Sequence, residues 1–522
     1  MNIQLRNLGA VLIVAVLTAA GCGGSSGGGD TSPPPTDPPP TDPPPSGGIV
    51  RSGVAVGAGP ITGFGSIIVN GITYDTSSAT FTRDDNPSSQ DEFEVGETVI
   101  VKGTIDDDNT NAVAETVELD EIVEGPVSSV NADGSLTVLG QTVTFGLDTA
   151  IDDSCPASFD DASIGAVEVY GDVDATGAIA ATRIECKIPP GDVIDEYEVN
   201  GTVSGLDTAN FTFMINGLEV NYASALIDDN FPGGTTTISE GDPVEVEGLP
   251  ADFNDGVTPP VMGASKVEYK GDVLGGNEGD HYEVDGFIRD FVSAADFNLN
   301  VGTVVIPVTA TSSTVYEGGT EADLANNLKI EVEGELDADG VLNATKIEIK
   351  TSTNIRVTGQ VDSVSTANGT ITILGITVNT DVLKTQFEDK SDASIEPFSI
   401  GDVNPDDYIE ARGQEQPAGE ITAFRVERDD FDVGDDTELR GFVEEGSVDN
   451  RDQFVILGVT VDTSTVPADN YFAEDENGVS TQVTADFFWD AVGTGGVIVD
   501  VNGSESTDGT TLIARELQLE ME

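Results

Sequence analysis

Two short signals recur six times beyond residue 59, and they constrain the fold more than any other feature of the chain. The first is an alternating apolar and polar run that ends on a glycine, and the second is an alanine followed three residues later by an apolar residue and then Glu or Gln. The closing glycines are Gly103, Gly171, Gly248, Gly334, Gly413 and Gly503, and the alanines are Ala114, Ala181, Ala264, Ala344, Ala423 and Ala514. We therefore expect six similar units in tandem.

Each unit is expected to hold about five strands. An apolar run with one glycine inside it, such as residues 371–378, predicts two strands joined by a tight turn or one strand bent by a bulge. Later in the unit, Val244 and Val246 alternate with Glu245 and Glu247, which is the period of a half-buried strand with its glutamates facing outward. Turn residues then precede the alanine signal, as a hairpin requires.

The predicted fold class is all-β, with six tandem small five-stranded barrels of the oligonucleotide/oligosaccharide-binding (OB) type. A unit of this size has a small core and gains stability when its sheet closes. A variable segment precedes the fourth strand of each barrel, and an open sandwich-like stack is the alternative architecture. The predicted repeats span residues 53–122, 123–188, 196–270, 282–350, 354–429 and 437–522.

The N-terminus predicts an exported, lipid-anchored protein. Residues 1–21 carry Arg6 and then an apolar stretch that is too short to span a bilayer and fits a signal peptide. The stretch Ala-Ala-Gly-Cys that ends at Cys22 resembles the bacterial lipoprotein signal, which implies that Cys22 is the acylated first residue of the mature chain; ordinary cleavage that removes Cys22 or leaves a free thiol is the alternative. By resemblance to enterobacterial sorting, Gly23 favours the outer membrane, on either its periplasmic or its outer face. Residues 22–52 form a Gly/Ser/Pro-rich linker, expected to be a disordered stalk.

Charge narrows the set of partners. The chain has 21 Lys and Arg against 95 Asp and Glu, a net charge of −74, which opposes binding to nucleic acids and to anionic headgroups. The simplest interpretation is a solvated acidic surface. No cofactor is expected, with the exception of calcium as a hypothesis, because Asp-rich loops can supply its oxygen ligands. The candidate ligands are Asp106, Asp107, Asp108, Asp172 and Asp174.

The remaining reactive side chains are few. Cys155 and Cys186 lie in one repeat of an exported protein and are expected to form a disulfide, with two separate buried thiols as the alternative. The single histidine, His281, is interpreted as a solvated linker residue, and no nucleophile motif accompanies it. Catalysis is therefore not expected. Phe487, Phe488 and Trp489 form the one aromatic group, which a core plug under the last repeat would explain.

These motifs resemble a bacterial domain of unknown function, the family numbered 5666. The resemblance rests on the Gly-x-Val opening, the apolar-Thr-apolar-Leu-Gly centre, the run from Gly241 to Gly248 and the Ala-x-x-apolar-Glu close, and it covers about residues 59 to 518. It implies exported lipoproteins with tandem units and no assigned activity. Two functions stay open: a structural or interaction protein of the cell envelope with a protein or glycan partner, or an array that binds an oligosaccharide or another small ligand.

Overall fold

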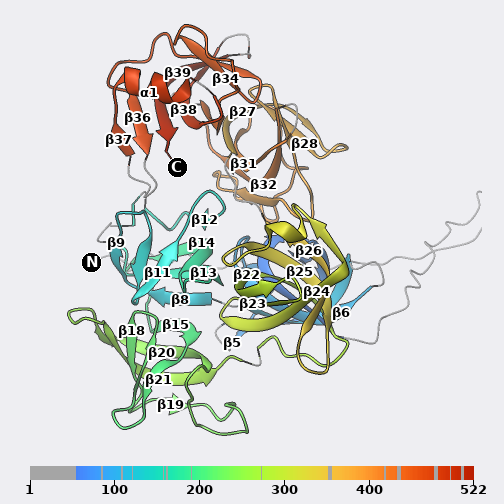
Figure 1. Cartoon of the computed structure of the whole chain (residues 1–522), viewed down its shortest axis with the longest axis vertical. Helices are drawn as coiled ribbons and strands as arrows, with labels where there is room; N and C mark the ends of the chain where they lie inside the picture. The colour runs from blue at the N-terminus through green and yellow to red at the C-terminus, as the bar shows by residue number, and fades with distance from the viewer. Residues whose placement is uncertain are drawn as a thin grey trace, which may run out of the picture. The chain divides into compact units, whose positions relative to one another are not determined.

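The computed structural model describes residues 54–521 apart from 84–85, 107–109, 120, 157, 160–162, 190, 272, 351–354, 417–418, 432–436, 475–479, 494, 507–508 and 510 (Figure 1). All of these residues belong to one compact unit, Ile49–Glu522. The predicted signal peptide, the linker and Cys22 lie outside the described residues. None of the helices in the described part has the length and hydropathy of a transmembrane span.

Each described barrel is built from a bent first strand, a hairpin, a short variable part and a final hairpin. The first barrel contains β1 (Ala55–Gly63), β2 (Ile67–Val69), β3 (Ile72–Asp75), β4 (Thr80–Arg83), β5 (Asn86–Ser88), η1 (Gln90–Glu92), β6 (Thr98–Ile105) and β7 (Asn111–Leu119). The second contains β8 (Glu121–Gly125), β9 (Val127–Val130), β10 (Leu136–Val138), β11 (Gln141–Thr144), β12 (Ala150–Ile151), β13 (Ala166–Val173) and β14 (Ile179–Lys187). The third contains β15 (Tyr197–Thr202), β16 (Ser204–Asp207), β17 (Thr212–Ile215), β18 (Leu218–Asn221), β19 (Leu226–Ile227), β20 (Pro243–Asn254) and β21 (Val261–Tyr269).

The other half of the described chain repeats this order. The fourth barrel contains β22 (His281–Ser293), β23 (Asp296–Val301), β24 (Val304–Glu317), η2 (Glu321–Asp323), β25 (Lys329–Leu336) and β26 (Leu342–Ile349). The fifth contains β27 (Ile355–Ser365), β28 (Thr370–Ile373), β29 (Ile376–Asn379), β30 (Gln386–Asp389), β31 (Tyr408–Gln416) and β32 (Glu420–Asp429). The sixth contains β33 (Thr437–Phe442), β34 (Gln453–Ile456), β35 (Val459–Asp462), β36 (Tyr471–Glu474), β37 (Ser480–Gln482), α1 (Ala485–Val492), β38 (Ile498–Glu505) and β39 (Thr511–Glu520).

The strand pairing closes these units into barrels. In the fifth barrel, β27 pairs antiparallel with both β28 and β31, β28 pairs with β29, and β32 pairs antiparallel with β31 and parallel with β29. This closed order, with the third and last strands parallel, is that of a small OB-type barrel. The predicted all-β, five-stranded barrel class is therefore confirmed, and the same order recurs along the described chain.

Both recurrent sequence signals belong to one structural feature, a bulge between the two strands of the final hairpin. In every barrel the closing glycine pairs directly with the signature alanine, and the register shifts at that glycine. A Cβ atom on Gly413 would lie 2.0 Å from the carbonyl oxygen of Thr422. Only glycine therefore lets the two backbones come this close, and the small alanine fills the interior beside the bulge.

The barrels are not independent domains, because the first strands of different barrels pair with one another. Strand β8 pairs antiparallel with β15, so the second and third barrels share a sheet and a hydrophobic core. The fifth and sixth barrels do the same through the antiparallel pairing of β27 with β33. Strand β1 pairs parallel with β22, which joins the first barrel to the fourth. Glu245, which was predicted to face outward, is only 7% exposed.

The helix α1 occupies the variable position between the third and fourth strands of the sixth barrel. Phe488 and Trp489 are buried there against Phe454 and Tyr471, whereas Phe487 is 46% exposed. Two of the three aromatic residues therefore close the end of this barrel as a plug.

Candidate functional site

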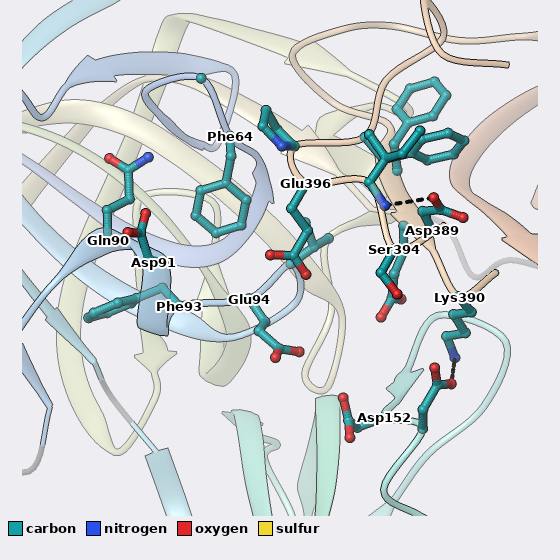
Figure 2. A pocket seen from close by; sticks show the side chains of 18 residues that line it. Phe64, Gln90, Asp91, Phe93, Glu94, Asp152, Asp389, Lys390, Ser394 and Glu396 are labelled. Atoms are coloured by element: carbon teal, nitrogen blue, oxygen red, sulfur yellow. Dashed lines mark hydrogen bonds and ion pairs between the residues drawn. The ribbon is translucent and has the colours of Figure 1, made fainter. Parts of the chain in front are cut away.

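A cleft of about 420 Å³ opens where the variable segments of three barrels meet (Figure 2). Most of the lining comes from segments between the third and fourth strands of the first, second and fifth barrels, where the sequence differs most from repeat to repeat, and Phe64 and Gly65 come from the turn after β1. Seven carboxylate residues and one lysine line the cleft. They are Asp91, Glu94, Asp152, Asp153, Glu388, Asp389, Glu396 and Lys390.

A buried arginine holds the wall of the cleft together. The side chain of Arg183, on β14, is 0% exposed and forms ion pairs with Glu94 of the first barrel and, at 2.5 Å, with Asp152. It also donates a hydrogen bond to the carbonyl oxygen of Val95 at 3.1 Å and lies 3.6 Å from Glu388 of the fifth barrel. One guanidinium therefore joins three barrels, since its fixed fork of donors can serve several acceptors at once.

The fifth-barrel side of the cleft carries a second arginine–carboxylate pair. Burial alone would raise the pKa of Asp389, but hydrogen bonds from Arg428, Ser391 and the backbone N–H of Ile395 lower it to about 2. The guanidinium of Arg428 also lies 4.6 Å from the ring centroid of Phe398, within the range of a cation–π contact. This carboxylate therefore stays charged and fixed at neutral pH.

Lys390 links the fifth barrel to the second across the cleft. Its ammonium donates a hydrogen bond to the carbonyl oxygen of Ile151 at 2.7 Å and forms ion pairs with Glu427 at 2.8 Å and Asp153 at 3.7 Å. Burial opposes the positive charge of Lys390, but Glu427 and Glu388 outweigh it and raise the pKa of the ammonium. Burial also raises the pKa of Asp153, against the attraction of Lys390.

Two acidic side chains of the cleft are left for a partner. Asp91 and Glu396 are exposed, and neither forms an ion pair within the described residues. Figure 2 shows Glu396, from the fifth barrel, and Phe64, from the turn after β1, on facing sides of the opening. The cleft thus offers free negative charge beside an aromatic ring.

The predicted disulfide between Cys155 and Cys186 is confirmed. It ties the segment after β12 to the last strand of the same barrel. That segment carries Asp152 and Asp153, so the crosslink fixes the second barrel's contribution to the cleft.

The predicted calcium ligands that the structure describes, Asp106, Asp172 and Asp174, do not form a common site. Asp107 and Asp108 lie outside the described residues, and Asp106 accepts hydrogen bonds from Thr110 and Asn111 within its own turn. Asp174 caps its own hairpin turn in the same way.

Asp172 is buried and already has partners. It accepts a hydrogen bond from the backbone N–H of Gly302 at 3.1 Å and forms an ion pair with Lys329 at 3.1 Å, which joins the second barrel to the fourth. Over the part of the chain that the structure describes, no group of three metal-ligating side chains is found.

His281 is not a solvated linker residue. It is the first residue of β22, it pairs with Ala55 of β1, and it is only 5% exposed. The acidic stretch before it suggested a linker, whereas its backbone belongs to the contact between the first and fourth barrels.

A charge pattern on the last strands was missed by the sequence reasoning. In the second to fifth barrels the signature glutamate lies directly opposite another glutamate of the fourth strand, as Glu427 lies opposite Glu410. Basic residues two positions before or after the signature glutamate neutralise these pairs. They are Arg183, Lys187, Lys266, Lys270, Lys346, Lys350 and Arg425. A search for a basic residue two positions before the signature glutamate would have found it in all four barrels.

Comparison with known proteins identifies four of the repeats. The family described as Domain of unknown function (DUF5666) matches residues 58–118, 124–185, 283–348 and 358–427, which are the first, second, fourth and fifth barrels. The predicted count of six family units stays a prediction. No curated protein matches the chain.

Proposed function

The chain belongs to the DUF5666 family, as a protein with tandem repeats of that domain. Since the family implies no activity, we propose the role of this protein from its own residues. The protein is a non-catalytic interaction protein of the cell envelope, anchored to the outer membrane through acylated Cys22. Its barrels form a scaffold, and the cleft between the first, second and fifth barrels is the surface that a partner contacts.

The anchoring part of the proposal rests on the leader and the stalk. A short apolar run followed by Gly21-Cys22 is typical of lipoprotein processing, and the proline-rich stretch after it would lift the barrels from the lipid surface. A disulfide in the second barrel fits an oxidising, extracytoplasmic compartment.

The cleft is the single observation that carries the interaction role. Loops that vary on a constant scaffold are where binding specificity resides, and here three such loops converge on one opening. Asp91, Asp153 and Glu396 present exposed carboxylates there. The chemistry favours a partner that carries Lys or Arg on its contact surface, because charges of opposite sign guide encounter and fix the docking register.

The experiment is proximity labelling in intact cells, with the label fused to the C-terminus and the outer membrane intact or permeabilised. A triple variant, Asp91→Asn, Asp153→Asn and Glu396→Gln, should lose its labelled neighbours. The matched control changes three exposed acids of the third and fourth barrels, Asp229→Asn, Asp255→Asn and Asp339→Asn, and should keep them. Equal labelling by the two triple variants would show that the cleft is not the contact surface, and a Cys22→Ser variant that stays with the membrane would refute the anchor.

A further inference from the structure

A second cavity, of about 500 Å³, lies where the second, fourth and fifth barrels meet, and its lining holds five cations against three carboxylates in an otherwise acidic protein. Five of the 21 Lys and Arg residues line it, so the rarest charge of the chain is concentrated at one place. They are Lys329, Lys350, Lys384, Arg412 and Arg425. This cavity is called the basic pocket below.

The cations of the basic pocket differ in how firmly they are held. Arg425 is 2% exposed and is fixed by Glu388 and Glu427. Lys384 is 42% exposed and has one carboxylate partner, Glu348, at 2.7 Å. Lys384 is therefore the cation freest to turn toward a ligand, whereas the arginine supplies a fixed positive wall.

Three buried polar atoms of the pocket lining have no hydrogen-bond partner among the described residues, and one of them, Nε of Arg425, lies in an ion pair with Glu427 at 3.2 Å. The other two are Oδ1 of Asp285, a residue that is 6% exposed, and Oγ1 of Thr182, a residue that is 8% exposed. A buried polar atom left unpaired costs about 1–3 kcal/mol, and such atoms in native proteins call for an explanation such as a bound ligand. Asp285 and Thr182 come from different barrels, so the cavity between them is where the missing partner would lie.

Aromatic side chains give the basic pocket an apolar surface beside its polar groups. Phe287 and Phe424 are half-buried at the wall, and the ammonium of Lys329 lies 5.8 Å from the Phe287 ring centroid. A flat apolar face beside fixed polar groups is the usual make-up of a small-molecule site of this volume.

We propose that the basic pocket binds an acidic sugar, a polyhydroxylated ring that carries a carboxylate. The carboxylate pairs with Lys384 beside the fixed arginines, ring hydroxyls donate to Asp285 and bond to Thr182, and the apolar face of the ring packs on a phenylalanine. Acetate would pair with the lysine but has no hydroxyl to donate to Asp285, phosphate has no apolar face to pack on a phenylalanine, and a neutral sugar offers Lys384 no carboxylate.

Calorimetric titration of the full chain tests this with glucuronate as the probe and glucose, acetate and phosphate as comparison ligands. Glucuronate should bind saturably and at least about tenfold more tightly than the other three, since each lost charge-assisted contact is worth about one decade of affinity. Binding of phosphate or acetate that equals glucuronate would overturn the proposal, as would the absence of saturable glucuronate binding.

Variants locate the site. Lys384→Gln, Asp285→Asn and Thr182→Val should each weaken glucuronate binding, the first two by about tenfold. Lys266→Gln, at an ion-paired lysine of the third barrel, is the matched control and should leave the affinity unchanged. Because Lys384 is substantially exposed, Lys384→Gln is expected to fold normally. It therefore still tests glucuronate binding if the variant of buried Asp285 or Thr182 unfolds. Unchanged affinity in Lys384→Gln, or an equal loss in Lys266→Gln, would contradict the assignment.

Discussion

The fourth and fifth barrels share one scaffold but treat their buried carboxyl groups in opposite ways. In the fourth barrel, burial and the neighbouring Glu331 and Glu333 raise the pKa of Glu283 to about 9. In the fifth, burial would raise the pKa of Glu427, but Arg425, Arg412 and Lys390 lower it well below the usual range. The two residues lie at different positions of the repeat, Glu283 on the first strand and Glu427 on the last. At the position of Glu427 the fourth barrel has Glu348, where burial would raise the pKa but Lys350 and Lys384 lower it.

The difference lies in the cations available to each barrel. Arg425 and Arg412 offer forked guanidinium groups to the glutamates of the fifth barrel. The fourth barrel has the single ammonium groups of Lys346 and Lys350, which are shared among several carboxylates. Arginine can satisfy two carboxylate oxygens at once, whereas lysine acts as a point charge. Glu283 in the fourth barrel has no arginine partner, and its raised pKa means that it binds a proton instead.

Removal of Arg425 should lower the stability of its barrel more than any other change proposed below, and it tests the difference between the fourth and fifth barrels most directly. Arg425→Met leaves Glu427 and Glu388 buried without their main counter-charge, and uncompensated burial of this kind costs about 3–5 kcal/mol. Native-state hydrogen exchange should show this loss in β31 and β32. Lys346→Met in the fourth barrel, where Glu283 is already protonated, should cost much less. Equal losses in the two barrels would mean that the arginine is not what distinguishes them.

Substitution of the bulge glycines should affect both barrels alike. A Cβ at Gly334 would lie 2.4 Å from the carbonyl oxygen of Asn343, and one at Gly413 would lie 2.0 Å from that of Thr422. Gly334→Ala and Gly413→Ala are each expected to destabilise their barrels by about 3 kcal/mol through backbone overpacking. Chemical denaturation followed by hydrogen exchange measures both. A large loss in one barrel only would show that the scaffolds are not equivalent.

Sequence patterns predicted the part of this fold that is encoded locally. Strand alternation, the hairpin turns and the paired Gly413 and Ala423 signals are short-range features, and they led to the right barrel class. The pairing of β1 with β22 was not predictable, because nothing near Ala55 marks a partner more than two hundred residues away. Outward-facing glutamates were taken as solvated for the same reason, since the barrel that buries them is remote in sequence.

The candidate site was less predictable than the fold. Each wall of the cleft comes from a segment that is unlike its counterparts in the other repeats, so no recurring motif marks it. Phe64, Phe93 and Phe398 lie in three unrelated sequence contexts and become neighbours of one cavity only through the packing of the barrels. The variability of these segments did indicate where specificity would lie, but their convergence depends on tertiary contacts such as those of Arg183.

Raising the pH should weaken the fourth barrel before the fifth. Glu283 and Asp285 have folded-state pKa values of about 9 and about 6, both above their ordinary values, so they bind extra protons in the folded state. The stability from these protons is complete below about pH 4 and is lost as the pH rises through 6 and then 9. Asp389, with a pKa of about 2, contributes in the opposite sense and loses its stabilisation only in strong acid.

Hydrogen exchange of the full chain between pH 5 and 9, corrected for the intrinsic rate, reports each barrel separately. Protection in β22 and β25 should fall by several kcal/mol over this range, whereas β31 and β32 should change little. A uniform response of both barrels would remove the electrostatic distinction between them.

Glu283→Gln is the smallest and most selective change. Glutamine copies the protonated carboxyl in shape but cannot ionise, so the variant avoids the proton uptake that Glu283 needs in order to fold at neutral pH and above. It should stabilise the fourth barrel at pH 8 and leave it unchanged at pH 4. Glu427→Gln is the matched change in the fifth barrel and should destabilise at pH 8, because Arg425 and Lys390 lose a charged partner. If both variants shift stability in the same direction at pH 8, the two carboxyl groups are in the same charge state, and the contrast between the barrels does not come from their cations.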